Sequence, residues 1–211
     1  MIKEIIMVLS AYLIGNLDFA YIVVKAVKNE DVRNYGSGNA GTTNVLRILG
    51  IKYAAPVFIL DALKGTLVIL LARMFGFSDL VVALSGVAVI CGHNWPVFLG
   101  YRGGKGSATS IGLILIYDWK IGIIAIAIAV GVVFFSKMIS LGSIVGMTTL
   151  PICAIAFRCA GAEWVSAAEI GLFIFLCASS IFRHRTNIKR IINGTESKVG
   201  QRIKVDDHTK K

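Results

Sequence analysis

Residues Phe98–Gly112 read FLGYRGGKGSATSIG, a glycine-rich polar stretch that meets an apolar run on either side. The two apolar runs occupy about residues 79–99 and 106–117. Glycine lowers the stability of a helix, and a cation near lipid costs more still. The stretch therefore either turns the chain between two membrane helices or holds something negatively charged.

The composition of the whole chain is that of a membrane protein. Of the 211 residues, 56% are hydrophobic and 16% are charged, whereas about a quarter of a soluble domain is charged. A membrane span needs about 20 apolar residues. We therefore expect an all-α, polytopic bundle of about seven transmembrane helices that forms a single domain, residues 1–211. The expected spans are about 3–25, 53–74, 79–99, 106–117, 120–136, 140–159 and 163–183.

The fourth of these spans is short. Gly106–Tyr117 would be about 18 Å long as a helix, against a hydrocarbon core of about 30 Å. A short segment directly after a glycine-rich loop suggests that the loop dips into the membrane, where irregular backbone survives only if protein or a water-filled cavity surrounds it.

The basic residues are distributed unevenly between the two sides of these spans. Seventeen of the 22 Lys and Arg residues fall on one side, four fall on the other, and Lys64 lies within a span. The positive-inside rule predicts that the first side is cytoplasmic, with the N-terminus outside and the C-terminus in the cytoplasm. Because these cations cluster at the ends of spans, the net charge of +10 does not indicate a nucleic-acid partner. Glu30 and Asp31 are the only acids in the cytoplasmic loops before the tail, so we expect no metal site and no cofactor.

Three segments with unusual chemistry share the predicted cytoplasmic face. The first, Tyr35–Gly50, places hydroxyl and amide side chains among glycines and ends near Arg47. Hydroxyls, amides, free backbone N–H groups and a guanidinium are donors that suit phosphate oxygens. The alternative is a flexible, solvated loop. The candidate anion-binding residues are Ser37, Gly38, Asn39, Thr43, Asn44 and Arg47.

The second segment is the glycine-rich stretch itself. Free N–H groups at the start of the following helix, its dipole and the Lys105 charge would together bind an anion. It is not a Walker A loop, because Gly106 stands where that motif needs Ser or Thr. The alternative is a basic turn attracted to anionic lipid. The candidate residues are Gly103, Gly104, Lys105, Gly106 and Ser107.

The third segment, Phe182–Glu196, follows the last span. Helical spacing places His184 and Asn187 on one face, among several cations. Taken alone, the segment is typical of a basic anchor at the cytoplasmic side. Ser140 and Ser143 begin the sixth span near the same face, where they could also be helix-packing residues.

Asp61 and Lys64 lie three residues apart within the second span. Charges inside a membrane are costly and usually pair with one another. We predict that they form an internal ion pair that braces the site.

In this order, the segments GSGNAGTTNVLRILG, GHNWPVFLGYRGGKGSATS and HRTNIKRIINGTE resemble the three signature segments of the bacterial integral-membrane acyl-phosphate:glycerol-3-phosphate acyltransferase family. The resemblance covers nearly the whole chain. It adds His93 to the candidate binding residues and favours Ser143 over Ser140. The departures are Thr42 for alanine, Asp18 for proline and Thr186 for glutamate.

The resemblance implies transfer of a fatty acyl group from acyl phosphate to the 1-position of sn-glycerol 3-phosphate, giving 1-acyl-glycerol 3-phosphate and phosphate. It also implies a multi-pass protein of the bacterial cytoplasmic (inner) membrane, surrounded by membrane lipid, with its site facing the cytoplasm. We expect a monomer with no cofactor.

The candidate catalytic residues are Ser37, Asn39, Lys105, His184 and Asn187. In this hypothesis Lys105 and the backbone of 103–107 bind the leaving phosphate. Arg47, His184 and Asn187 would hold glycerol 3-phosphate, while Ser37 and Asn39 would orient the attacking hydroxyl or polarise the carbonyl. The general base stays open between His184 and a substrate phosphate oxygen. A transporter of a small organic phosphate is the alternative function, although no convincing inverted repeat relates the two halves.

Overall fold

The computed structural model describes residues 1–201 and is helical throughout its regular parts. Within this range the helices are α1 (Ile2–Gly15), α2 (Phe19–Lys28), α3 (Thr42–Leu49), α4 (Ile51–Met74), α5 (Asp79–Asn94), α6 (Ser107–Tyr117), α7 (Trp119–Ser136), α8 (Ile139–Cys159), α9 (Ala167–Arg183) and α10 (Arg185–Ile192). Two short 3₁₀ turns, Val32–Asn34 and Val97–Leu99, lie in the connections.

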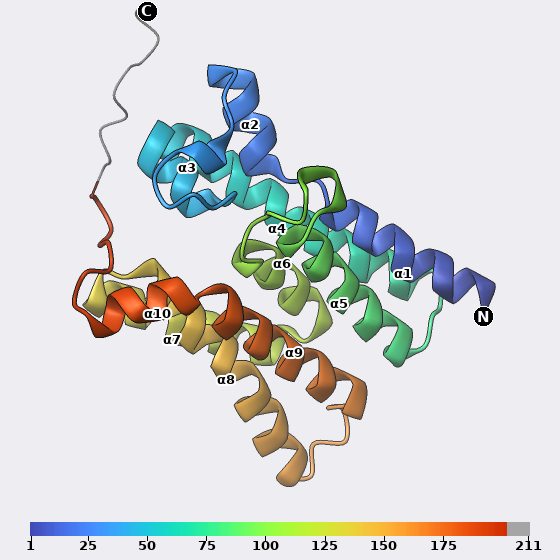
Figure 1. The fold of residues 1–211 in the computed structure, drawn as a ribbon. Coiled ribbons are helices and arrows are strands. Elements are labelled where there is room, and N and C mark those ends of the chain that lie inside the picture. The colour runs from blue at the N-terminus through green and yellow to red at the C-terminus, as the bar shows by residue number, and fades with distance from the viewer. Residues whose placement is uncertain (202–211) are drawn as a thin grey trace, which may run out of the picture.

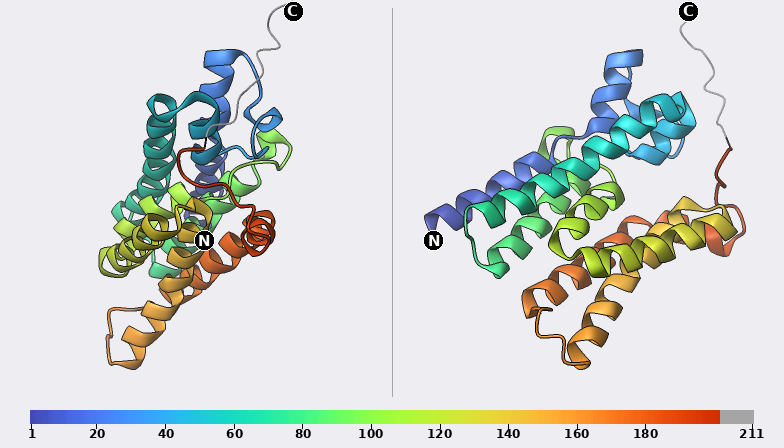
Figure 2. Two further views of the ribbon diagram at one scale, coloured as in Figure 1. Left: turned by 90° about the vertical axis from the view of Figure 1, so that its left-hand side faces the viewer. Right: turned by 180° about the vertical axis from the view of Figure 1, so that it is seen from behind.

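The helices pack as two neighbouring groups (Figure 1). In the first group α1 packs on α5, and α4 packs on α6; in the second, α7 packs on α8, and α8 on α9. Contacts between α5 and α9 join the two groups. Figure 2 shows that α2, α3 and α10 gather at one end of the bundle, whereas the α8–α9 loop lies at the opposite end.

The apolar lengths agree with a membrane protein. Five segments within residues 1–201 are long and apolar enough to cross a bilayer: 2–28, 51–74, 79–99, 119–136 and 139–159. The α9–α10 pair gives a sixth if its 61° bend lies within one span. Helix α6, with 11 residues, is short, as the sequence predicts. The expected count of seven spans stays a prediction, as does the orientation.

The first expected span, 3–25, is not one continuous helix. Helix α1 ends at Gly15, and α2 begins at Phe19 after Asn16, Leu17 and Asp18. The Asp18 carboxylate caps α2 by accepting a hydrogen bond from the Tyr21 N–H at 2.9 Å. A polar N-cap within an apolar run explains the break, because it satisfies a backbone donor that the new helix leaves free.

Close packing of α4 and α6 fixes the start of α6, where the glycine-rich stretch ends. A Cβ on Gly65 of α4 would lie 2.2 Å from the Thr109 carbonyl oxygen, and one on Gly112 of α6 would lie 2.0 Å from that of Ala62. Small residues at membrane helix interfaces allow this close approach. No larger side chain fits at either position without moving α6.

Residues 202–211 lie outside the described part of the chain. They belong to the predicted single domain and carry four of the tail cations that entered the orientation argument: Arg202, Lys204, Lys210 and Lys211.

Candidate active site

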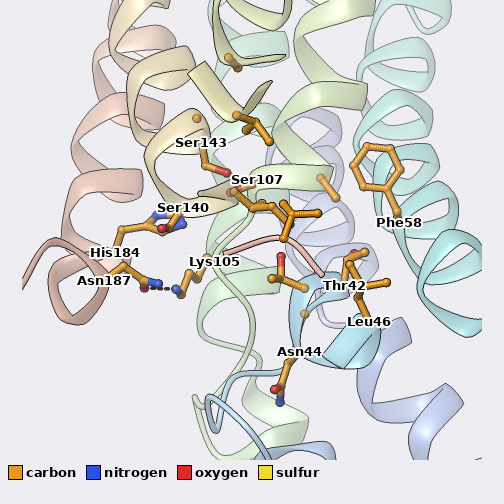
Figure 3. A pocket seen from close by; sticks show the side chains of 18 of the residues that line it. Thr42, Asn44, Leu46, Phe58, Lys105, Ser107, Ser140, Ser143, His184 and Asn187 are labelled. Atoms are coloured by element: carbon orange, nitrogen blue, oxygen red, sulfur yellow. Dashed lines mark hydrogen bonds between the residues drawn. The ribbon is translucent and has the colours of Figure 1, made fainter. Parts of the chain in front are cut away.

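A cavity of about 870 Å³ lies where the three polar segments meet. The connection before α3, the start of α6, the start of α8, the α9–α10 junction and residues 196–201 contribute to its wall. Figure 3 shows Lys105, Ser143, His184 and Asn187 on one side of it and Thr42 with Leu46 on the other. Segments far apart in the sequence are therefore brought to one site, as their predicted common face requires.

Most of the candidate residues line this cavity, and three do not. Gly38, Gly103 and Gly104 are not part of the wall. Those that line it are Ser37, Asn39, Thr43, Asn44, Arg47, His93, Lys105, Gly106, Ser107, Ser143, His184 and Asn187, together with Ser140.

Lys105 is the central cation of the polar end. Its ammonium group donates a hydrogen bond to Asn187 Oδ1, which joins the glycine-rich stretch to α10. Burial, followed by the repulsive charge of Arg190, lowers the pKa of Lys105 from 10.5 to about 8. A lysine with this pKa is mostly protonated at neutral pH. A bound anion would raise the pKa and further favour the charged form.

Asn187 in turn is held by Glu196. Asn187 Nδ2 donates to Glu196 Oε1 at 2.7 Å, Ser140 Oγ donates to the same oxygen at 2.8 Å, and Arg190 Nε donates to Oε2 at 2.8 Å. Although burial alone would raise the pKa of Glu196, these three hydrogen bonds hold it below its usual value. Glu196 thus fixes the chain Glu196–Asn187–Lys105, and the amide of Asn187 is engaged at both ends.

The two serines of α8 differ in what they contact. Ser140 is buried and its hydroxyl is committed to Glu196. Ser143, one turn further along, lines the cavity beside Ser107 (Figure 3), and within residues 1–201 its hydroxyl makes no hydrogen bond. Of the two α8 serines, Ser143 is therefore the one with an unengaged hydroxyl within residues 1–201, and its contact with a ligand stays a prediction.

His184 is oriented by the helix that precedes it. Its Nδ1 lies 2.9 Å from the Ser180 carbonyl oxygen. Because a carbonyl can only accept, Nδ1 carries the hydrogen, and Nε2 is left as the basic nitrogen. His184 is buried and lines the cavity, so the position of its lone pair is defined by the fold.

In the first segment, Asn44 organises the loop. Its Oδ1 accepts from the Ser37 N–H at 3.0 Å, and its Nδ2 donates to the carbonyls of Val32 (3.1 Å) and Tyr35 (3.0 Å). The Asn44 side chain is fully occupied by backbone, so it positions Ser37. The predicted contact of Asn44 with a substrate stays a prediction.

Arg47 is the free cation of this segment. It is half-buried on α3, and within residues 1–201 its guanidinium makes no hydrogen bond or ion pair. Burial lowers the pKa of Arg47, but a guanidinium remains charged at physiological pH. A partly desolvated guanidinium facing a cavity is suited to bind a phosphate in two-point fashion.

Gly103 and Gly104 serve packing. A Cβ on Gly103 would lie 2.1 Å from the His93 carbonyl oxygen, and one on Gly104 would lie 2.1 Å from His93 Nε2. The Gly104 N–H donates to the His93 carbonyl at 3.0 Å, so it is not free for an anion. Of the N–H groups expected to bind phosphate, that of Gly104 is therefore engaged, whereas those at the start of α6 line the cavity where no side chain caps the helix.

The expected internal ion pair is confirmed. Lys64 Nζ lies 2.8 Å from Asp61 Oδ1, and it also lies 2.7 Å from His93 Nδ1 and donates to the Leu17 carbonyl at 2.7 Å. His93 is buried against this pair and against Gly104. The cluster supports the glycine-rich stretch from behind. The role of His93 in binding a substrate stays a prediction.

Comparison with known proteins identifies the family. Residues 5–194 match the family model described as glycerol-3-phosphate acyltransferase. Curated glycerol-3-phosphate acyltransferases from Thermoanaerobacter sp. (strain X514) and Clostridioides difficile (strain 630) are 50% and 44% identical, covering 92% and 94% of this chain and 95% and 96% of theirs. The chain belongs to the glycerol-3-phosphate acyltransferase family.

Solved structures agree with this assignment. A crystal structure of PlsY (YgiH), an integral membrane glycerol 3-phosphate acyltransferase, in its glycerol 3-phosphate form is 35% identical, with a TM-score of 0.85 over 94% of this chain and 96% of that one. Its lysophosphatidic acid form is 33% identical, with a TM-score of 0.82 over the same shares. This chain is therefore an integral membrane acyltransferase by family and by fold.

Two residues of this acyltransferase were not among the sequence-based candidates. Glu196 is the last residue of the third segment. The available signal was that it is the one acid of that segment, among several cations. Arg183 donates from Nε to the Gly104 carbonyl at 3.0 Å and from Nη2 to the Gly103 carbonyl at 2.9 Å. Arg183 had no distinguishing signal, because an arginine at the end of a span is typical of membrane topology.

Proposed function

We propose that the protein transfers a fatty acyl group from acyl phosphate to the 1-position of sn-glycerol 3-phosphate. The observation that carries the proposal is one cavity with a cationic end, formed by three separate segments, and an apolar end between helices. Both substrates carry phosphate, and only one carries a long apolar tail. A cavity with a cationic end and an apolar end therefore suits both acyl phosphate and glycerol 3-phosphate.

The cationic end supplies the phosphate contacts in this proposal. Lys105 and the uncapped start of α6 bind the phosphate of the donor, and Arg47 with Ser37 binds that of glycerol 3-phosphate. Asn187 and Glu196 act by positioning Lys105. Thr43, Asn39 and Ser143 complete the polar wall around the reacting groups.

The apolar end accepts the acyl chain. Its floor consists of the buried side chains of Ile114, Ala125 and Met147, whereas Val130 and Phe134 at its edge are 61% and 64% exposed. From Ser107 to Ile114 helix α6 rises about 10 Å, which is shorter than the roughly 15 Å of one lipid leaflet. The end of a membrane-length chain would therefore leave the cavity past α7 into lipid.

The reaction needs no covalent enzyme intermediate. The 1-hydroxyl oxygen attacks the acyl carbonyl, the bond from the carbonyl carbon to the phosphate oxygen breaks, and inorganic phosphate leaves. The hydroxyl proton passes to a phosphate oxygen or to His184 Nε2. Because acyl phosphate is already activated, positioning and charge neutralisation at the leaving phosphate supply the rate enhancement.

We further propose a monomeric protein of the bacterial cytoplasmic membrane, with the N-terminus outside and this cavity open to the cytoplasm. The clustering of Lys and Arg at the α3 and α10 end of the bundle supports this orientation. Glycerol 3-phosphate would then enter from the cytoplasm and the acyl donor from the membrane.

The test is purified protein in detergent with palmitoyl phosphate and labelled glycerol 3-phosphate. The proposal predicts that label appears in lysophosphatidate with release of one phosphate per product. Uptake of the label only when the protein is in sealed vesicles, without product in detergent, would contradict it and would favour a transporter.

A further inference from the structure

A second hollow, of about 420 Å³, lies at the other end of α6 from the catalytic cavity. Helix α6 rises about 15 Å between Ser107, which lines the catalytic cavity, and Tyr117, which lines the hollow. The hollow and the polar part of the cavity therefore lie at opposite ends of α6. The last turn of α4, the start of α5, the α6–α7 junction and the α8–α9 loop form the hollow. Figure 1 shows that loop at the end of the bundle away from α2 and α3.

Glu169 is the residue that the fold leaves unsatisfied there. It lies in the first turn of α9, is 3% exposed and lines the hollow. Among residues 1–201, its buried Oε1 has no hydrogen-bond partner. A buried carboxyl oxygen without a partner costs free energy that a positively charged ligand would recover.

The other acids of the hollow are already paired. Asp79 accepts hydrogen bonds from the Tyr117 hydroxyl at 2.8 Å and from Ser166. Asp118 accepts from the N–H groups of Lys120 (2.9 Å) and Ile121 (3.2 Å) as the cap of α7. The Glu169 carboxyl lies against the Asp118 carboxyl and the Ser166 backbone N–H, so its unpartnered Oε1 is the atom that remains available to a ligand.

Both cations of the hollow already have partners within the protein. Arg73 donates to the carbonyls of Ile116 (2.6 Å) and Tyr117 (2.7 Å), and Lys120 Nζ lies 4.3 Å from the centre of the Trp164 ring. The hollow thus contains three carboxyl groups against two cations. A bound cation would stabilise the ionised form of the neighbouring Asp118 and Glu169.

The residues that line the hollow favour an organic cation over a metal ion as its ligand. No group of three or more His, Cys, Asp or Glu side chains in the described chain is arranged to hold a metal ion. Trp119 and Trp164 are 61% and 45% exposed at this rim, at the ends of apolar helices where membrane proteins place aromatic side chains at headgroup level. Aromatic faces beside a carboxylate are the usual recognition elements for alkylammonium groups. Lys120 lies over Trp164, so within residues 1–201 Trp119 is the tryptophan of this rim without a cation on its ring.

We propose that this hollow binds the primary ammonium headgroup of an aminophospholipid, with the ammonium on Glu169 and the lipid phosphate beside Lys120. A zwitterionic headgroup fits a hollow that presents both signs of charge, and the membrane supplies it continuously. The bound lipid stabilises the junction of α4, α6, α7 and α9. This site is independent of the acyl-transfer reaction.

The test compares lipids with identical tails on the purified full-length protein in mixed micelles. Phosphatidylethanolamine should raise Tm by about 3 °C or more relative to phosphatidylglycerol or N-acetylated phosphatidylethanolamine. Glu169→Gln should abolish this difference, and Glu163→Gln, which removes the same charge from an exposed position in the adjoining loop, should retain it. A difference that survives Glu169→Gln would overturn the proposal.

Two further measurements keep the test decisive. Native mass spectrometry of the wild type, which needs no variant, should show one retained phosphatidylethanolamine in competition with an equal amount of phosphatidylglycerol; equal retention would refute the site. Free ethanolamine at millimolar concentration should leave Tm unchanged. If it reproduces the full shift, the ligand is a soluble amine and the lipid assignment is wrong.

Discussion

The two ends of α6 carry opposite charge imbalances. At its start, Lys105 and Arg47 face a cavity, and within residues 1–201 neither is bonded to a carboxylate, because Glu196 is bonded to Ser140, Asn187 and Arg190. At its other end, Arg73 and Lys120 are engaged with carbonyls and an aromatic ring, and Oε1 of Glu169 has no partner among residues 1–201. In the two proposals above, the first end binds anions and the second binds a cation. The difference lies in which groups the fold has already paired, since both ends contain acids and bases.

The strongest test of the anion-binding end is Lys105→Ala. Removing the cation from the leaving phosphate should reduce kcat by about 10³-fold or more. Lys52→Ala removes an exposed cation from the first turn of α4 and should retain activity. Steady-state kinetics with palmitoyl phosphate measures both. Near-normal turnover of folded Lys105→Ala would remove Lys105 from the mechanism.

Glu196→Gln should have the next largest effect. The substitution keeps the shape but removes the charge and turns one of the two acceptor oxygens into an NH₂ donor. Either Arg190 or the Asn187 and Ser140 pair therefore loses its acceptor, at a cost of about 1–3 kcal/mol. We expect a lower Tm together with a fall in kcat of about 10–100-fold, because Lys105 loses its support. A variant with normal Tm and normal kcat would show that the Glu196–Asn187–Lys105 chain is unimportant.

The alkaline pH dependence should report Lys105. Its pKa is lowered to about 8, so the free enzyme loses this charge as the pH rises through 8. The value of kcat/KM for acyl phosphate should therefore fall above about pH 8. In Lys105→Arg, which stays charged, any residual activity should keep its value to higher pH. An identical alkaline limb in both proteins would assign it to another group.

Ser143→Ala and Ser140→Ala should distinguish a serine that contacts the ligand from one that holds Glu196 in place. Ser143 makes no hydrogen bond within residues 1–201, so its loss should raise KM or lower kcat by about tenfold without changing Tm. Ser140→Ala leaves Glu196 with one fewer donor and should lower Tm by about 2–4 °C. The reverse pattern would exchange the two roles.

The sequence predicted the class of fold and the convergence of three segments, because apolar run length and charge asymmetry are direct consequences of the bilayer. It also predicted the Asp61–Lys64 pair, since a charge in a membrane needs a partner. It did not predict the break at Asn16–Asp18, where a short N-cap motif lies within an apolar run.

The sequence was less informative on how each candidate acts. Gly103 and Gly104 suggested free N–H groups, but their neighbours His93 and Arg183 come from distant positions, so their packing role could not be read locally. Asn44 and Asn187 line the cavity, yet the amide of Asn44 is occupied by backbone groups and that of Asn187 by Glu196 and Lys105. Distinguishing a residue that contacts a ligand from one that positions it requires knowing its partners.

The central claim is that the first segment and the helix α8 serine share one phosphate-binding cavity. It can be tested by replacing the native cysteines, introducing Ser37→Cys or Ser143→Cys singly, and measuring the labelling rate with a water-soluble thiol reagent. Glycerol 3-phosphate should slow labelling at both positions in a saturable way, and should leave a control cysteine at exposed Asn29 unaffected. Protection at only one of the two positions, or at neither, would contradict the account.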